Sequence, residues 1–259
     1  MAVTDLLSIA SGSVVGFALG LLGGGGSILA VPLLVYVVGV RSTHVAIGTS
    51  ALAVAANAFT NLIAHSRAGH VKWPCAVTFA AAGVAGAAAG ARLGQMVDGR
   101  QLLFLFGLVM LAVAAGMFAP RAAQGDPGVR MDRAIALRLV GIGLIVGLLS
   151  GFFGIGGGFL IVPAIMLGSG MATINAVGSS LVSVGAFGLT TAASYAFTGL
   201  VDWRTAGLFI LGGIAGGLAG VTLAKRLSRR RAVLTRLFAG VVVAVAGFIL
   251  WRSAPGIFR

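Results

Sequence analysis

The feature that most constrains this 259-residue chain is a glycine-rich segment that occurs twice. Residues 20–34 read GLLGGGGSILAVPLL and residues 151–165 read GFFGIGGGFLIVPAI, with seven of the fifteen positions identical at an offset of 131. Both copies lie in strongly apolar surroundings. A duplicated membrane half with a glycine-broken helix in each copy is typical of secondary transporters. The repeat therefore predicts two homologous halves that each contain one interrupted helix.

The composition predicts that lipid covers most of the surface. Hydrophobic residues make up 59% of the chain and charged residues 9%, against about 25% charge in an ordinary soluble domain. The apolar segments lie at 5–22, 27–40, 44–65, 73–95, 101–119, 134–153, 157–170, 174–198, 204–224 and 232–251. Most of these segments are long enough for a membrane helix, and a pattern typical of strands is absent. We expect an all-α, polytopic membrane protein.

A polar link at residues 120–133 divides the chain into a first membrane repeat, 1–119, and a second, 134–259. Its Pro, Gly and charged residues are typical of an exposed connector. The similarity of the halves extends beyond the glycine motif, because Val71-Lys-Trp73 aligns with Val201-Asp-Trp203 at an offset of 130. Each half is expected to hold a glycine-broken helix pair and three further transmembrane helices.

Glycine also recurs every four residues in equivalent places, at Gly12, Gly16 and Gly20 and at Gly143, Gly147 and Gly151. On a helix this spacing makes a smooth groove in which a neighbouring backbone can approach closely. We expect these glycines to serve helix packing.

The basic residues predict the orientation of the halves. If each glycine-broken pair forms a hairpin, twelve Lys and Arg residues fall on one side of the membrane and six on the other. If each pair makes a single crossing, the split is nine to nine. Basic residues accumulate on the cytoplasmic side, so the hairpin is favoured, and its odd number of crossings makes the repeats inverted. Both termini are then expected outside the cytoplasm. The net charge of +13 follows from these loops, and no nucleic-acid partner is expected.

The breaks predict a site for an anion. A second half-helix is expected to start near Ser27 in the first copy and near Gly158 or Phe159 in the second. The first turn of a helix leaves N–H groups unpaired and carries the positive end of the helix dipole. Glycines before it allow a ligand to approach the backbone. The expected substrate-binding residues are Gly23, Gly24, Gly25, Gly26, Ser27, Gly154, Gly156, Gly157 and Gly158. The alternative is that these glycines only permit tight helix crossing.

Polar side chains in the next apolar segment of each half can line the same site. We select Ser50, Asn57, Asn61 and Ser180, because hydroxyl and amide groups can donate to an oxyanion without supplying a full charge. The alternative is that they bond one helix to another, as Ser, Thr and Asn often do in membranes. Phe187 replaces Asn57 and Thr191 replaces Asn61 in the second copy, so such a site is asymmetric.

The paired motifs G-L-L-G-G-G-G-S-x-L-x-V-P and G-F-F-G-I-G-G-G-F-L-x-V-P resemble those of the TauE/SafE family of membrane transporters. The resemblance covers nearly the whole chain. It implies a carrier of the inner membrane, associated with export of sulfite or of sulfur-containing organic anions. The expected partners are such a small anion and the lipid bilayer, and a homo-oligomer stays open.

The residues that the chain lacks narrow the choice further. It contains no Glu, and its five Asp residues lie in predicted loops or near the N-terminus, so a carboxylate relay within the membrane is not expected. We find no P-loop, no protease or lipase motif and no metal-ligand cluster. We therefore expect no enzyme, metal or cofactor. A permease for another small solute, or a polytopic membrane enzyme or assembly factor, are the competing functions. The three histidines are expected at interfaces, with His65 the best candidate for a proton relay.

Overall fold

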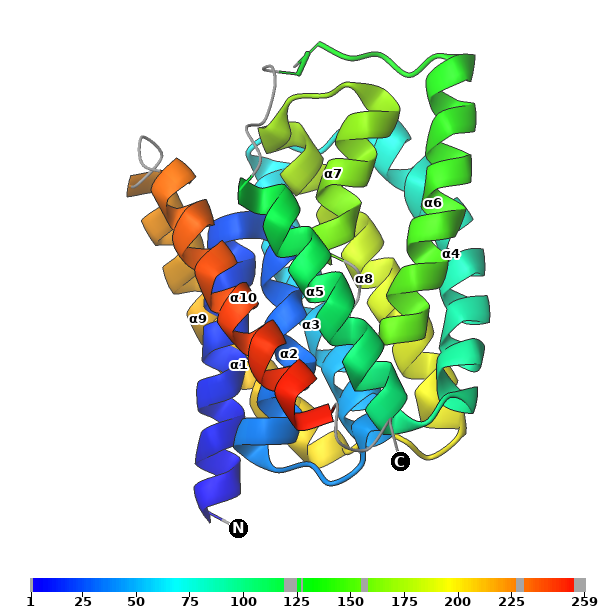
Figure 1. Ribbon diagram of the computed structural model, residues 1–259. Coiled ribbons are helices and arrows are strands. Elements are labelled where there is room, and N and C mark those ends of the chain that lie inside the picture. The colour runs from blue at the N-terminus through cyan, green and yellow to red at the C-terminus, as the bar shows by residue number, and fades with distance from the viewer. Residues whose placement is uncertain (1, 119–124, 127, 155–157, 227–230, 254–259) are drawn as a thin grey trace.

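The computed structural model describes residues 2–118, 125–126, 128–154, 158–226 and 231–253. Within these residues the chain is a bundle of helices (Figure 1). The first half comprises α1 (Ala2–Leu22), a 3-10 helix η1 (Gly23–Leu29), α2 (Ala30–Leu33), a π-helix η2 (Leu34–Val38), α3 (Thr43–Arg67), α4 (Trp73–Met96) and α5 (Gly99–Phe118). The second half comprises α6 (Arg133–Phe153), α7 (Gly158–Ser169), α8 (Thr173–Phe197), α9 (Trp203–Arg226) and α10 (Arg231–Ser253).

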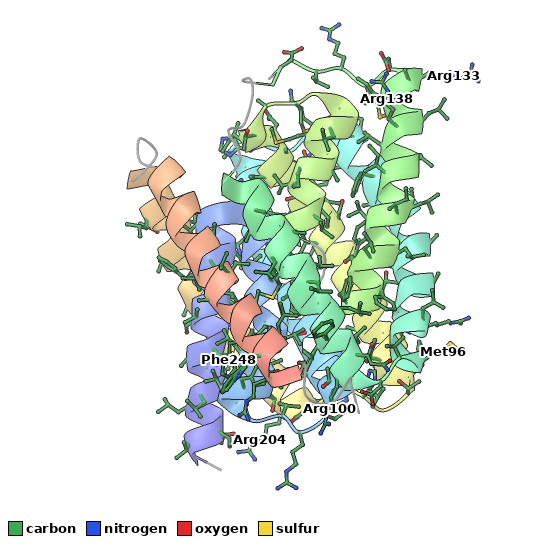
Figure 2. The ribbon with its side chains drawn as sticks, viewed as in Figure 1. Met96, Arg100, Arg133, Arg138, Arg204 and Phe248 are labelled. Atoms are coloured by element: carbon green, nitrogen blue, oxygen red, sulfur yellow. The ribbon has the colours of Figure 1, made fainter. Side chains whose placement is uncertain are left out.

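Six of the described helices are long and apolar enough to cross a membrane, and they belong to α1, α3, α4, α6, α8 and α9. Exposed leucine, valine and phenylalanine side chains are numerous on the outside of the bundle, as expected for a surface that faces lipid. The expectation of an all-α polytopic membrane protein is confirmed. Figure 2 shows Arg133 and Arg138 near one end of the bundle and Arg100 and Arg204 near the other.

Tight helix pairs join the two halves to each other. α1 packs along α9, and α4 packs along α6. A Cβ atom on Gly16 would overlap the backbone of Gly213, and one on Gly147 would overlap the backbone of Gly83. The predicted packing role of the four-residue glycine spacing is therefore confirmed, because only glycine lets these backbones come so close.

The centre of the bundle is the pair formed by α3 and α8. Gly188 packs against Ala51 and Ala55, whereas Gly185 packs against Phe59. Residue numbers therefore fall along α8 as they rise along α3, so these two equivalent helices run antiparallel. α5 and α10 form a further pair across the front of the bundle (Figure 1).

Candidate functional site

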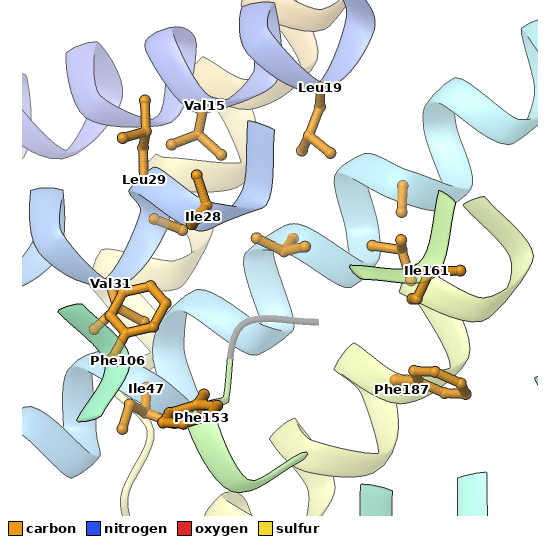
Figure 3. Packing of buried hydrophobic residues seen from close by; sticks show 14 of the residues in the cluster. Val15, Leu19, Ile28, Leu29, Val31, Ile47, Phe106, Phe153, Ile161 and Phe187 are labelled. Carbon is orange, nitrogen blue, oxygen red and sulfur yellow. The ribbon is translucent and has the colours of Figure 1, made fainter. Parts of the chain in front are cut away.

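The first glycine run folds back on the helix that precedes it. Residues Gly23–Leu29 form the 3-10 helix η1, and a Cβ on Gly26 would overlap the backbone of Ala18 and Leu19 in α1. Ser27 and Ile28 are buried, and Figure 3 shows Ile28 and Leu29 beside Val15 and Leu19. Ser27 thus lies inside a 3-10 helix rather than starting an α-helix, because the close approach at Gly26 holds the chain in a tighter turn.

The second glycine run ends one helix and starts another. α6 stops at Phe153, and Gly154 adopts a left-handed conformation with φ of 66°, which glycine adopts without strain. α7 begins at Gly158, at the predicted place. Gly156 and Gly157 lie outside the described residues. A Cβ on Gly154 would overlap the side chain of Ile47 in α3, so this break is held against the central helix of the other half.

The first glycine run packs against the helix that follows the second. η1 packs against α7, and it also packs against α8. The 3-10 helix of the first run thus contacts α7 and α8 of the second half, whereas Gly154 of the second run contacts Ile47 in α3 of the first half. The predicted Ser50 and Ser180 are buried one turn after Ile47 and its counterpart Val177. They lie toward opposite ends of the antiparallel pair of α3 and α8, because Gly48 contacts Leu200 whereas Gly178 contacts His70.

The hydroxyl groups of these two serines already have partners. Ser50 donates to the backbone oxygen of Ile47 at 2.9 Å, and Ser180 donates to that of Val177 at 2.8 Å. Each hydroxyl oxygen keeps its capacity to accept a bond. To donate to an anion, each side chain has to rotate away from its own helix.

Asn57 and Asn61 lie on the face of α3 that meets α9. Asn61 donates its amide to the backbone oxygen of Asn57 at 2.9 Å. The side chain of Asn57 lies against Gly213 and is fully buried, yet neither its amide nitrogen nor its oxygen has a hydrogen-bond partner among the described residues. Burial of an amide without partners costs roughly 1–3 kcal/mol by protein mutational measures. Asn57 is therefore the strongest candidate among these side chains to form hydrogen bonds with a ligand, because both polar atoms of its amide lack partners among the described residues.

The counterpart of Asn57 is apolar. Phe187 packs against Gly83, which is the equivalent of Gly213, and its ring stacks on that of Phe79 at 6.1 Å between centroids. The predicted asymmetry between the halves is thus visible in equivalent positions.

Three further buried hydroxyl groups are not among the residues that we selected from the sequence. Ser150, Ser183 and Thr191 are buried, and their oxygen atoms have no hydrogen-bond partner among the described residues. Ser150 lies one turn before the break at Gly154, where the first copy has Leu19. This serine in place of leucine was the signal that could have identified it.

The described carboxylates lie at the ends of helices or in the connections between them. Asp5 pairs with Arg204 at 2.7 Å, while Asp132 accepts from the N–H of Ile135 at the start of α6. Burial alone would raise the pKa of Asp202, but hydrogen bonds from Thr205 and the charge of Arg204 hold that pKa below its ordinary value. No group of three or more His, Cys, Asp or Glu in the described part of the chain could hold a metal ion.

Comparisons with known proteins agree with one another. The family model described as "Sulfite exporter TauE/SafE" matches residues 8–249. A "Probable membrane transporter protein" of Xylella fastidiosa (strain 9a5c) is 53% identical over 253 residues, covering 96% of this chain and 95% of the relative. The "Probable membrane transporter protein YunE" of Bacillus subtilis is 25% identical, covering 88% and 92%. A similarly described protein of Methanocaldococcus jannaschii is 30% identical, covering 74% and 71%. No solved structure matches.

Proposed function

Because the chain belongs to the TauE/SafE family of membrane transporters, we propose that it exports a small sulfur-containing anion, sulfite or an organosulfonate. The family and the relatives are transporters rather than enzymes. The proposed binding site lies near the middle of the membrane, between the two glycine breaks.

The packing of η1 against α7 is the observation that carries this proposal. α7 starts at Gly158 and has twelve residues, and Gly154 before it is in the left-handed conformation, so glycine at these positions lets a ligand approach the backbone closely. A helix start attracts an anion with roughly 0.3–1 kcal/mol when exposed and up to about 2 kcal/mol when partly buried. The N–H groups of η1 and the unpartnered amide of Asn57 are further donors in the proposed site. Together these donors suit an anion with a dissociation constant between millimolar and micromolar, which corresponds to a binding free energy of about −4 to −8 kcal/mol.

Neutral donors suit a carrier, since a carrier must release what it binds. Lys and Arg are absent from the described residues of both breaks and from the middle of α3 and α8. The anion is therefore held by dipoles rather than by a full opposite charge, which keeps its affinity moderate.

The contacts between the halves support an inverted repeat. α1 packs on α9 as α6 packs on α4, and α3 runs antiparallel to its counterpart α8. Two equivalent helices run antiparallel when the two-fold axis that relates them is perpendicular to both, and we propose that this axis lies in the membrane plane. In such transporters the halves exchange conformations to open the site to each side in turn.

We propose a location in the inner membrane, as the family implies, and the charge distribution supports both termini outside the cytoplasm. The start of α1 and the end of α10 lie at the same end of the bundle (Figure 1). The end of α9 and the start of α6 lie at the opposite end, where the basic residues Arg133 and Arg138 are found (Figure 2).

The proposal is tested by flux into proteoliposomes that contain the purified protein. Sulfite, thiosulfate and a set of sulfonates are the substrates, with a neutral solute for comparison. Gly25→Val and Gly156→Val should abolish anion flux because the added side chain keeps the ligand from the backbone. Gly141→Val is the matched control, since a Cβ at Gly141 meets no other atom within 4 Å. Equal flux in all three variants would show that the glycines serve packing alone.

A further inference from the structure

Two equivalent corners connect the central helices to the next helix in each half. The α3–α4 corner comprises residues 65–72, and the α8–α9 corner comprises residues 195–202. Their backbones agree closely. Gly69 and Gly199 both have φ of 71°. The backbone N–H of His70 donates to the backbone oxygen of His65 at 3.1 Å, and the backbone N–H of Leu200 donates to that of Tyr195 at 2.8 Å. The corners therefore differ only in their side chains.

Those side chains differ strongly in charge. The α3–α4 corner carries His65, Arg67, His70 and Lys72 where the α8–α9 corner carries Tyr195, Phe197, Leu200 and Asp202. The α3–α4 corner thus has two basic side chains and two imidazoles. At the equivalent positions the α8–α9 corner has two aromatic side chains, a leucine and a carboxylate.

The imidazoles of the α3–α4 corner are held in place rather than free in solvent. The rings of His65 and His70 lie 5.6 Å apart between centroids. Nδ1 of His70 is buried and has no hydrogen-bond partner among the described residues. The backbone oxygen of His70 accepts from the amide of Asn175 at 3.2 Å, and the N–H of Lys72 donates to Ser179 at 2.9 Å.

A basic residue that serves only to orient the protein in the membrane has to be exposed to water but needs no fixed position. The two histidines are half-buried, and imidazoles contribute little to the orientation rule, which counts Lys and Arg. His65 also lies on the same helical face as Asn61 and Asn57, at four-residue spacing. A polar face of α3 therefore leads from this corner toward the candidate site. The equivalent face of α8 carries Tyr195, Thr191 and Phe187, of which the last is stacked on Phe79.

We propose that the α3–α4 corner is a loading site for a small oxyanion, which it concentrates before transfer to the site between the breaks. The proposal rests on the proposed function for the identity of the anion. The α8–α9 corner has no Lys or Arg at the equivalent positions and carries Asp202 instead, although the ring of His44 lies 6.3 Å from that of Tyr195 there. The two ends of the transport path therefore differ in their attraction for the substrate.

The described groups around these imidazoles are basic or neutral, apart from two carboxylates at this end of the bundle. Arg67 belongs to the same helix, Lys72 and Cys75 lie at the start of α4, and α8 presents the neutral Asn175 and Ser179. Asp126, whose backbone pairs with Gly170 and Ala172, and Asp132, at the start of α6, are the described acidic residues of this end. Their carboxylates already accept from the N–H groups of Gly128 and Ile135.

The three tryptophans of the chain allow a direct test, because Trp73 and Trp203 follow the two corners in equivalent positions. Their side chains are 48% and 67% exposed. Variants that keep one of these tryptophans, with the others changed to Phe, are placed in nanodiscs of phosphatidylcholine. The quenching constant for iodide, an anion, is divided by the quenching constant for acrylamide, a neutral molecule. This ratio corrects for the different exposure of the two tryptophans. We expect this ratio to be roughly three- to tenfold higher at Trp73 than at Trp203.

Sulfite should lower the ratio at Trp73 saturably. Arg67→Gln with Lys72→Gln should remove the difference between the two tryptophans. The matched control, Arg130→Gln with Arg133→Gln, removes two exposed charges from the same end and should preserve the difference. His65→Tyr with His70→Leu, which gives this corner the residues of the other, should weaken the competition by sulfite at Trp73.

Each contrary outcome identifies what is wrong. Equal ratios at the two tryptophans, no saturable competition by sulfite, or an equal loss in the control pair would overturn the loading site. Loss of the sulfite effect on addition of phosphatidylglycerol alone would show that a lipid headgroup occupies the corner, which also overturns it. Saturable sulfite binding without any flux in proteoliposomes would instead keep the loading site and refute the proposed transport function.

Discussion

The backbone N–H of Lys72 donates to the hydroxyl of Ser179 at 2.9 Å, which ties the first half of the chain to the second. The equivalent bond exists with the halves exchanged, since the N–H of Asp202 donates to the hydroxyl of Thr49 at 3.0 Å. Both hydroxyls are buried on the central helices. The antiparallel pair of α3 and α8 is therefore clamped at each end by the same contact.

Ser179→Ala and Thr49→Ala should destabilise the protein to a similar degree, because each leaves a buried N–H without its partner. We expect about 1–3 kcal/mol for each, and additive losses in the double variant because the two sites lie far apart. Chemical unfolding in detergent measures both quantities. Ser13→Ala is the control, since that hydroxyl donates only to its own helix. A loss at one end alone would show that the two bonds are not equivalent.

Substitution of Gly16 or Gly147 by Ala should weaken the contacts between α1 and α9 and between α6 and α4. The added methyl overlaps backbone atoms that cannot move aside, and overpacking of this kind costs about 1–3 kcal/mol. The free energy of unfolding is the measurement. Gly240→Ala is the control, because nothing lies within 4 Å of a Cβ there, and alanine should stabilise that helix by up to about 1 kcal/mol.

Much of the architecture was predictable from the sequence. The apolar segment 73–95 corresponds to α4 at Trp73–Met96, and 101–119 to α5 at Gly99–Phe118. Long apolar runs bounded by Pro, Gly and charge fix such helices locally. The segment 27–40 was less predictable, since it contains a 3-10 helix, one turn of α-helix and a π-helix. Its shape depends on the contact of Gly26 with α1, which a linear pattern does not reveal.

The burial of the selected polar residues on the central helices was predictable from the sequence, and their hydrogen bonds were less so. The asymmetry between Asn57 and Phe187 was visible in the sequence, whereas the partners of Ser50 and Ser180 depend on side-chain rotation. The pairing of α1 with α9 of the other half was also beyond the sequence, since glycine spacing shows that a helix packs closely but not on which neighbour. The assignment of the breaks and these side chains to substrate stays a prediction.

Asn57→Leu should separate stability from transport. Leucine removes a buried amide that has no partner, so we expect the free energy of unfolding to stay equal or to rise, by up to about 3 kcal/mol. Anion flux should fall at least roughly tenfold if the amide contributes about 1.4 kcal/mol or more to binding. Thr60→Val is the control, since that hydroxyl bonds to its own helix. Unchanged flux in Asn57→Leu would remove Asn57 from the site.

Asp202 should make stability fall in acid. Its folded-state pKa lies below the ordinary value of 3.8, so its contribution is complete above that pH and disappears as the pH falls through the lower folded-state pKa. Asp202→Asn should flatten the dependence of the unfolding temperature on pH below about 4. Asparagine also keeps an oxygen for the N–H of Thr205, which Asp202 binds at 3.0 Å, and Asn caps helices well. If the unfolding temperature of the variant fell with pH as steeply as that of the parent, Asp202 would not be the cause of the acid sensitivity.

The orientation of the two halves is testable with one matched pair of cysteines. Cys75 is the single cysteine of the chain, so Cys75→Ala gives a background without thiols. Ala68 and Thr198 are exposed and occupy equivalent positions in the two corners. In an inverted repeat, Ala68→Cys reports the cytoplasmic side and Thr198→Cys the opposite side, because the first accompanies Arg67 and Lys72 and the excess of positive charge lies inside. An impermeant maleimide added to intact cells should therefore label Thr198→Cys, and it should label Ala68→Cys only after the membrane is opened. Labelling of both from outside would exclude an inverted repeat, and labelling of Ala68→Cys alone would reverse the predicted position of the termini.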